Sequence, residues 1–214
     1  MSIAAFILGE SGTGKSTSLR NMDPADTLLI QAIKKPMPFR SSGWAYVTQA
    51  GGNMIVCDDS AKIVALMHKT KRPVIVIDDY QYILANEYMR RTDERGYDKF
   101  TDIGRHAWDI MCAASSMPDH VRVYILSHTE TSEAGRVKAK TIGKMLDEKI
   151  TLEGMFSIVM RTCIINGQYL FSTRNNGQDT VKTPMGLFDA DHIENDLAMV
   201  DSAITEYYHL KAAA

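Results

Sequence analysis

The chain has 214 residues, of which 45% are hydrophobic and 23% are charged, a composition that argues against a disordered, collagen-like or membrane protein. Against a typical domain of about 150 residues, this length favours one domain, residues 1–214, over two. The 24 Lys and Arg residues nearly balance the 26 Asp and Glu residues, so no global positive field attracts nucleic acid or anionic lipid, and any polyanion must meet a local patch.

Short β-branched runs alternate with stretches in which apolar residues have helical spacing. The expected strands are residues 3–8, 27–33, 74–77 and 121–126. The expected helices between them are residues 15–21, 60–69, 81–91 and 101–115. Asp59 and Ser60 form an expected N-cap. The alternation predicts βαβ units, with a buried parallel sheet covered by helices on both faces.

The pattern changes after residue 130. Residues 156–165 and 168–173 flank Asn166-Gly167, the strongest short signal for a hairpin, so an antiparallel pair is expected to extend the sheet. Residues 193–208 have the spacing of an amphipathic helix. The predicted fold class is α/β, with a mainly parallel sheet, flanking helices and a C-terminal antiparallel hairpin.

The cysteines and the start of the chain favour a cytoplasmic protein. Cys57, Cys112 and Cys163 are odd in number and form no CxxC motif, which fits a reducing compartment. The first residues lack the basic start and long apolar core of a signal peptide. No apolar run reaches the roughly 18 residues that suggest a transmembrane helix. The expected location is the cytoplasm, without membrane contact.

A phosphate-binding motif lies between the first expected strand and helix. Residues 9–16, GESGTGKS, match G-x-x-x-x-G-K-[ST] at every fixed position. The glycines let backbone N–H groups surround a β-phosphate, and the helix start faces the same charge. Lys15 is expected to reach the β- and γ-phosphates, and Ser16 to ligate Mg²⁺. The expected nucleotide-binding residues are Gly9, Glu10, Ser11, Gly12, Thr13, Gly14, Lys15, Ser16 and Thr17.

Two carboxylates, Asp78 and Asp79, follow four buried β-branched residues, which is the Walker B pattern. A buried carboxylate is costly unless something pairs with it. Mg²⁺, reached through water and Ser16, is the expected partner of Asp78. Ser16 and Asp78 are therefore the expected metal-binding residues. Asp79 either polarises the attacking water or caps the next helix, and the two roles are compatible.

Polar residues also follow the strand at 121–126. Because the carboxyl ends of parallel strands face the ligand crevice, Ser127 and His128 are candidate sensors of the γ-phosphate, with a structural role for His128 as the alternative. Glu130 is a second carboxylate that could act as a base. No NKxD or TKxD motif supports GTP specificity. Glu10 stands where the deviant partition ATPases carry a lysine.

The chain resembles the small phage-encoded AAA-type ATP-binding proteins with a RecA-like core in residues 7–16, 76–82, 96–100, 126–130 and 175–186. Some members of this group are linked to single-strand annealing and recombination. The resemblance covers nearly the whole chain. It implies a RecA-like P-loop fold and ATP hydrolysis with Mg²⁺ by a homo-oligomeric ring or filament. It also implies action on single-stranded DNA in phage recombination or replication, beside phage single-strand-binding or replication proteins in the host cytoplasm.

One residue departs from the RecA-like pattern. These ATPases usually carry a catalytic Glu where this chain has Gln31, and Gln can orient a water but cannot take its proton. Either Asp79 or Glu130 substitutes as the base, or hydrolysis is slow and the protein works partly as an ATP-dependent assembly switch. A P-loop kinase of a nucleotide or small molecule is a further alternative. The expected catalytic set is Lys15, Gln31, Asp78, Asp79, His128 and Glu130.

Two groups of cations are candidate DNA surfaces. The first contains Arg136, Lys138 and Lys140, with Lys144 and Lys149 beyond them. Its alternating cations could contact phosphates, and the alternative is a solvated hairpin. The second combines Lys34, Lys35 and Arg40 with Phe39 and Trp44. Its aromatic side chains suit base stacking.

A last pair of cations follows from the resemblance. RecA-like assemblies place a cation after a late strand, where it reaches the γ-phosphate of a neighbouring subunit. Arg174 and Lys182 lie at that stage of this chain and are expected to act in trans. The alternative is an exposed loop whose charges do nothing.

Overall fold

A mainly parallel sheet organises the chain in the computed structural model, which describes residues 2–143, 146 and 149–210. Over these residues the sheet has nine strands. Eight of them follow one another in space as β3 (Met54–Val56), β2 (Thr27–Gln31), β4 (Val74–Asp78), β5 (Arg122–Thr131), β1 (Ile3–Gly9), β7 (Ile158–Ile165), β8 (Gln168–Ser172) and β9 (His192–Glu194). The run from β3 to β7 is parallel, and β7, β8 and β9 pair antiparallel.

The carboxyl ends of the parallel strands meet at one edge of this sheet. Gly9 on β1 lies opposite His128 on β5, and Gln31 on β2 lies opposite Asp78 on β4. Strand β5 separates β1 from β4. The residues that follow β1, β2 and β4, together with His128 on β5, therefore surround one crevice, as expected for an open α/β sheet.

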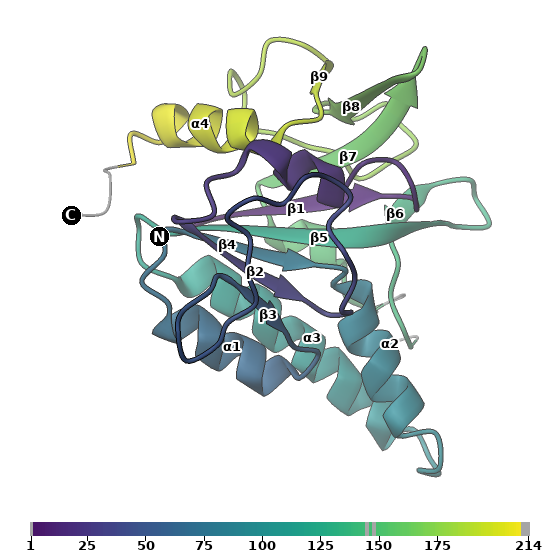
Figure 1. The fold of residues 1–214 in the computed structure, drawn as a ribbon. Coiled ribbons are helices and arrows are strands. Elements are labelled where there is room, and N and C mark those ends of the chain that lie inside the picture. Colours follow the sequence, from purple (N-terminus) through teal and green to yellow (C-terminus); the bar gives the residue numbers. More distant parts are fainter. Residues whose placement is uncertain (1, 144–145, 147–148, 211–214) are drawn as a thin grey trace.

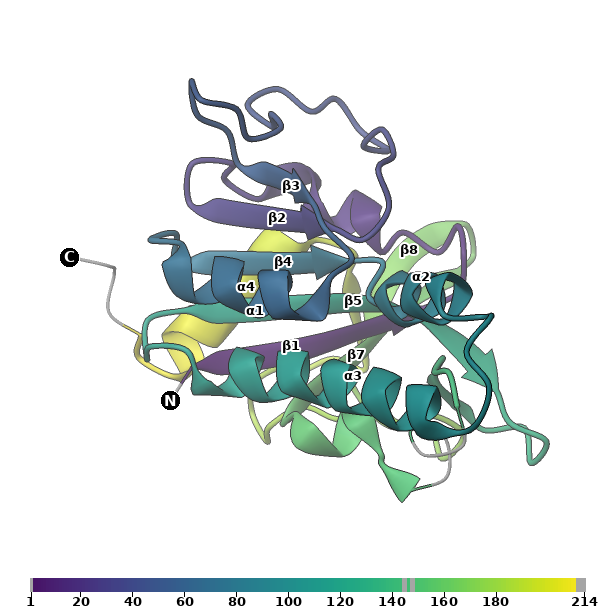
Figure 2. The same cartoon turned by 90° about the horizontal axis from the view of Figure 1, so that it is seen from below.

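Helices cover both faces of the sheet, as predicted (Figures 1 and 2). One face packs against α1 (Ser60–Lys69), α2 (Gln81–Arg90), α3 (Asp98–Ser116) and the short η3 (Leu152–Met155). The other packs against η1 (Ser16–Asn21) and α4 (Leu197–Tyr207). Each strand of the parallel core alternates its apolar side chains between the two layers. Asp59 caps α1, because its carboxylate accepts a hydrogen bond from the Lys62 N–H at 3.0 Å.

Two antiparallel hairpins extend the parallel core. The predicted hairpin is confirmed, since β7 and β8 turn at Asn166 and Gly167, whose φ angles are 52° and 78°, as a type I′ turn requires. Strand β6 (Val137–Ala139) folds back on the end of β5 and forms the second hairpin. The predicted architecture is confirmed: this is an α/β fold with a mainly parallel sheet, flanking helices and a C-terminal antiparallel hairpin.

Two predicted helices differ from the structure. Residues 16–21 form a 3₁₀ helix, not the α-helix predicted for 15–21, and the Ser18 hydroxyl bonds the Lys15 carbonyl at 2.6 Å, a local bond that competes with α-helical pairing. The helix predicted for 193–208 begins only at Leu197, because Ile193 pairs with Phe171 in β9. Strand β3 was not predicted.

Among the residues that the structure describes, none of the helices combines the length and the apolar character needed to cross a bilayer. Cys57, Cys112 and Cys163 are all free thiols.

Candidate nucleotide-binding site

The P-loop backbone has the curled conformation that its glycines were predicted to allow. Gly12 and Gly14 have φ angles of 78° and 97°, a region that strains side chains other than glycine. Gly9 is required for another reason: a Cβ there would lie 1.9 Å from the Thr162 Oγ1 atom. The end of β1 therefore packs directly on β7, and the loop after it is held in place by the sheet.

Lys15 lies inside this loop with little exposure. Its side-chain ammonium donates to the carbonyl oxygens of Gly9 and Glu10, both at 2.8 Å, and only 6% of the residue is exposed. Burial lowers the pKa of Lys15 to about 8, against the raising influence of Asp78 and Asp79. The loop carbonyls thus hold the ammonium where a phosphate oxygen could replace them.

Ser16 and Asp78 are joined across the crevice. The Ser16 hydroxyl donates to the Asp78 Oδ2 atom at 2.8 Å. Asp78 is fully buried, and its other oxygen accepts from the Asp79 N–H at 3.0 Å. Burial, followed by the charge of Asp79, raises the pKa of Asp78. This hydroxyl and carboxylate are an oxygen-only donor pair that fits Mg²⁺, an ion that keeps several waters and is shared with substrate phosphates.

Asp79 has a strained backbone and two cationic or proton-bearing neighbours. Its φ angle is 61°, which is uncommon outside glycine but better tolerated by Asp and Asn. Its carboxylate forms an ion pair with Lys35 and lies 3.5 Å from the His128 Nε2 atom. Burial alone would raise the pKa of Asp79, but His128 and Lys35 outweigh burial and lower it. Asp79 is therefore a carboxylate at neutral pH.

Lys35 comes from the segment that follows β2. Burial disfavours its charged form, but the charges of Asp78 and Asp79 outweigh burial and raise the pKa of Lys35. His128 completes the link between the two sides of the crevice, because its Nδ1 atom lies 3.5 Å from the Lys15 Nζ atom. The ring of Tyr82 packs edge-on against His128, with the ring centres 5.8 Å apart.

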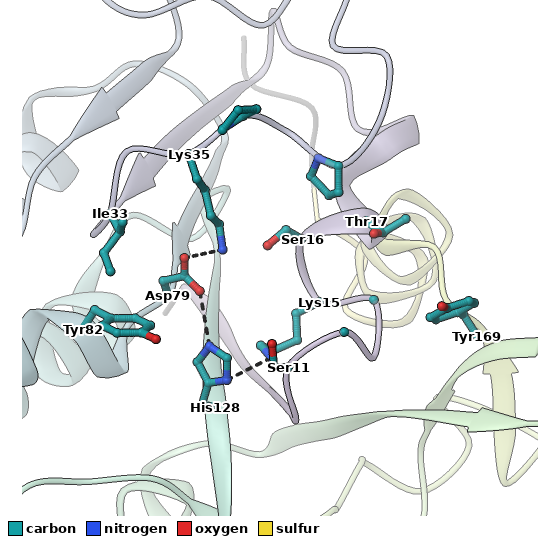
Figure 3. A pocket seen from close by; sticks show the side chains of 14 residues that line it. Ser11, Lys15, Ser16, Thr17, Ile33, Lys35, Asp79, Tyr82, His128 and Tyr169 are labelled. Carbon is teal, nitrogen blue, oxygen red and sulfur yellow. Dashed lines mark hydrogen bonds and ion pairs between the residues drawn. The ribbon is translucent and has the colours of Figure 1, made fainter.

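These groups surround a cavity of about 590 Å³ (Figure 3). Its lining comprises Ser11, Gly12, Gly14, Lys15, Ser16, Thr17, Ile33, Lys35, Pro36, Pro38, Asp79, Tyr82, His128 and Tyr169. We call residues 9–17 the P-loop wall. We call Ile33, Lys35, Asp79, Tyr82 and His128 the facing wall. Thr17 and Tyr169 lie at the end of the cavity away from the facing wall.

Several of the predicted site residues lie outside this lining. Gln31 is fully buried; its carboxamide accepts from the Tyr46 hydroxyl at 3.0 Å and donates to the Lys35 carbonyl at 3.4 Å. Glu130 lies on the β5–β6 hairpin, 3.4 Å from the Lys138 ammonium. Ser127 is buried, and its hydroxyl has no hydrogen-bond partner within the described residues.

The other predicted cations also lie away from the cavity. Arg174 pairs with Asp191 at 2.8 Å, and the Lys182 backbone exchanges hydrogen bonds with Val159 near the start of β7. Arg136 and Lys140 are exposed on the β5–β6 hairpin, which projects from the body of the molecule (Figure 1). Lys144 lies outside the described residues.

The second predicted DNA surface is wrong in its aromatic part. Trp44 is only 9% exposed and belongs to one core cluster, so its ring is not free to stack on bases, and the partly buried Phe39 packs against the same cluster. Lys35 instead lines the cavity described above. Its position just beyond the carboxyl end of a parallel strand was the available signal. Nothing local in the sequence indicated Tyr82 or Tyr169.

No protein-family model matches this chain, and no curated protein sequence does. Among solved structures, the chain is similar to the genome-packaging NTPase B204 from Sulfolobus turreted icosahedral virus 2 in complex with ATP-γS. The two chains share 12% sequence identity with a TM-score of 0.40, and the match covers 83% of this chain and 78% of the viral one.

Proposed function

We propose that this chain binds and hydrolyses ATP with Mg²⁺. The observation that carries the proposal is the joint placement of Lys15, Ser16 and Asp78. An ammonium held by loop carbonyls and a hydroxyl hydrogen-bonded to a buried carboxylate both line one cavity. A polyphosphate needs both features: a positive charge for its oxygens and an oxygen pair for its metal.

The residues of the P-loop wall would bind the phosphates. Backbone N–H groups of the curled loop point their partial positive charges at an anion. Lys15 would exchange the Gly9 and Glu10 carbonyls for oxygens of the β- and γ-phosphates. Ser16 would hold Mg²⁺, with Asp78 behind it through water. When bound, the metal neutralises charge on the phosphates.

Asp79 is the favoured base. It lines the cavity, whereas Glu130 lies on a hairpin and is engaged with Lys138. In hydrolysis, a water oxygen bonds to the γ-phosphorus and the bond from that phosphorus to the bridging oxygen breaks. ADP leaves with the electron pair, and Asp79 takes the water proton, which then passes to solvent. Without ATP, the Asp79 carboxylate is paired with Lys35 and lies beside His128, which would slow its action as a base. The second candidate function is therefore an ATP-dependent switch with slow hydrolysis.

We further propose that the protein acts on single-stranded DNA as a homo-oligomer in phage recombination or replication. The exposed cations Arg136 and Lys140 on the β5–β6 hairpin, together with Lys138, would contact DNA phosphates. Arg174 or Lys182 would reach the site of a neighbouring subunit. Neither cation lines the cavity of its own chain, so their positions do not support a role in the site of the same subunit.

The test is calorimetric titration with ATP-γS and ADP in Mg²⁺, followed by phosphate release from ATP with and without single-stranded DNA. Binding together with DNA-stimulated release supports the proposal. Binding without release favours the switch, and transfer of the phosphate to an added acceptor favours a kinase. Absence of nucleotide binding would refute the assignment.

Two variant sets test the DNA and trans roles. Arg136→Ala with Lys140→Ala should weaken DNA binding and reduce its salt dependence, because fewer counterions are released. Lys62→Ala, an exposed cation on α1, is the matched control. Mixing Lys15→Ala subunits with Arg174→Ala or Lys182→Ala subunits should restore turnover if the site is shared. Turnover that does not depend on protein concentration, with no rescue, would leave a self-contained site.

A further inference from the structure

The segment after β2 supplies the cavity with a cation that the P-loop motif does not include. Lys35 and Lys15 enter the cavity from opposite walls, one from residues 33–38 and the other from the P-loop (Figure 3). Asp79 is the carboxylate in the lining, and it pairs with Lys35 in the absence of an anion. A polyphosphate between the walls would bring more negative charge to this cation than Asp79 alone provides.

The backbone around Lys35 is held before any ligand binds. Pro36 follows it, and a residue before proline is restricted to extended conformations. Gln31 holds the same segment through its amide nitrogen, which donates to the Lys35 carbonyl at 3.4 Å and to the Met37 sulfur at 3.7 Å. The Tyr46 hydroxyl in turn donates to the Gln31 oxygen. A Glu at position 31 could not donate to the Lys35 carbonyl, because an ionised carboxylate only accepts.

The side chain itself is free to change partner. Its relative exposure is 38%, against 4% for Asp79, so the ammonium lies at the open side of a buried carboxylate. Its four-carbon stem can redirect the charge without backbone movement. The side chain of the neighbouring Lys34 lies elsewhere: it is exposed, and its ammonium lies over the Tyr46 ring, 5.2 Å from the ring centre.

We propose that Lys35 binds the terminal phosphate of the nucleotide in cis, and that Gln31 is the positioning residue that holds the Lys35 segment against the cavity. The inference rests on the proposed function, since it needs a nucleoside triphosphate in the P-loop. The γ-phosphate is the expected partner because the P-loop and Lys15 would surround the β-phosphate, while Lys35 lies on the facing wall beside Asp79 and His128. Gln31 thus stabilises a phosphate-binding segment in place of supplying a base.

The discriminating measurement is the ratio of the affinities for ATP-γS and ADP, each titrated with Mg²⁺ into the full chain. Lys35→Gln should weaken ATP-γS binding by about tenfold or more, because a charge-assisted hydrogen bond is lost, and should leave ADP binding within about twofold. Lys35→Arg should restore most of the ratio, since the charge is kept. Lys34→Gln removes the same charge one residue away and should change neither affinity.

Gln31→Met tests the positioning role without introducing a charge. It removes the three hydrogen bonds of the carboxamide, with the Lys35 carbonyl, the Met37 sulfur and the Tyr46 hydroxyl. It should lower the ratio of the ATP-γS affinity to the ADP affinity severalfold, in the same direction as Lys35→Gln. ADP affinity serves as the check that the variant is folded. In the double variant, adding Gln31→Met to Lys35→Gln should lower the ratio of the ATP-γS affinity to the ADP affinity little further, because both substitutions act on the same contact.

The outcomes separate the two proposals. If the natural chain binds neither nucleotide, the proposed function fails and the role of Lys35 falls with it. If the natural chain binds both, and Lys35→Gln weakens both equally or neither, the proposed function stands and the role of Lys35 is refuted. Lys35 would then only neutralise Asp79. If Lys35→Gln selectively lowers the ATP-γS affinity and Lys35→Arg restores it, then Lys35 binds the terminal phosphate within its own subunit.

Discussion

The two walls of the cavity are built in different ways. The P-loop wall is a single stretch of chain, residues 9–17, and its geometry comes from backbone angles such as the φ values of Gly12 and Gly14. The facing wall collects side chains from the segment after β2, from Asp79 just after β4, from His128 within β5, and from helix α2. A local sequence pattern can encode the first wall, whereas the second exists only once the sheet has formed.

The walls also differ in what holds them. Lys15 is bound by carbonyls of its own loop, five and six residues away. Lys35 is held through Asp79, 44 residues further along the chain, and through the buried Gln31. The P-loop wall is therefore expected to tolerate changes elsewhere in the protein, and the facing wall to respond to substitutions outside the cavity.

The largest effect is expected from Lys15→Ala. Removing the ammonium takes charge-assisted bonds from the phosphates, so nucleotide affinity should fall by at least about 100-fold. The fold should survive, because Lys15 contacts the loop and not the apolar core, and circular dichroism with a thermal scan checks this. Nucleotide affinity close to that of the natural chain would contradict the role given to the P-loop wall.

Gly9→Ala tests how firmly the P-loop wall rests on the sheet. The new Cβ would collide with the Thr162 Oγ1 atom at 1.9 Å, so urea unfolding should show a loss of about 2–3 kcal/mol, as overpacking typically costs. Thr162→Ala in the same chain removes the colliding oxygen and should recover part of that loss. Equal stability of the single and double variants would show that the close packing is not the reason for the glycine.

Asp79→Asn separates two proposed roles of the facing wall, phosphate binding by Lys35 and proton removal by Asp79. Asn tolerates the left-handed backbone and no longer competes for Lys35, so ATP-γS affinity should rise by about three- to tenfold. Phosphate release should instead fall by about tenfold or more, because the base is lost. Glu130→Gln is the comparison and should leave both unchanged. A loss of release in Glu130→Gln alone would assign the base to the hairpin carboxylate.

The smallest effect is expected from Tyr46→Phe. It removes one hydroxyl, which donates to Gln31 at 3.0 Å, and should cost about 1 kcal/mol or less in unfolding free energy. The ATP-γS to ADP affinity ratio should fall slightly, and less than in Gln31→Met. A change in ADP affinity of the same size would place the effect on the P-loop wall and so weaken the contrast between the walls.

What the sequence predicted correctly depends on neighbours along the chain. The hairpin at Asn166-Gly167 follows from left-handed backbone angles that these residues adopt easily. The cap of α1 follows from one carboxylate near one N–H. Two of the predictions that failed concern competition with distant partners: Ile193 joined a strand in place of a helix, and Trp44 entered the core in place of a surface.

The sequence by itself determined the α/β class, the P-loop and the acidic end of β4, because hydrophobic period and motif spacing act within a few residues. Only the tertiary structure decided which side chains face the P-loop. Strand order placed β5 between β1 and β4 and brought His128 beside Asp79. The path of the chain after Gln31 then turned Lys35 toward the same carboxylate. Contacts over such separations depend on the register of whole strands, which no local pattern specifies.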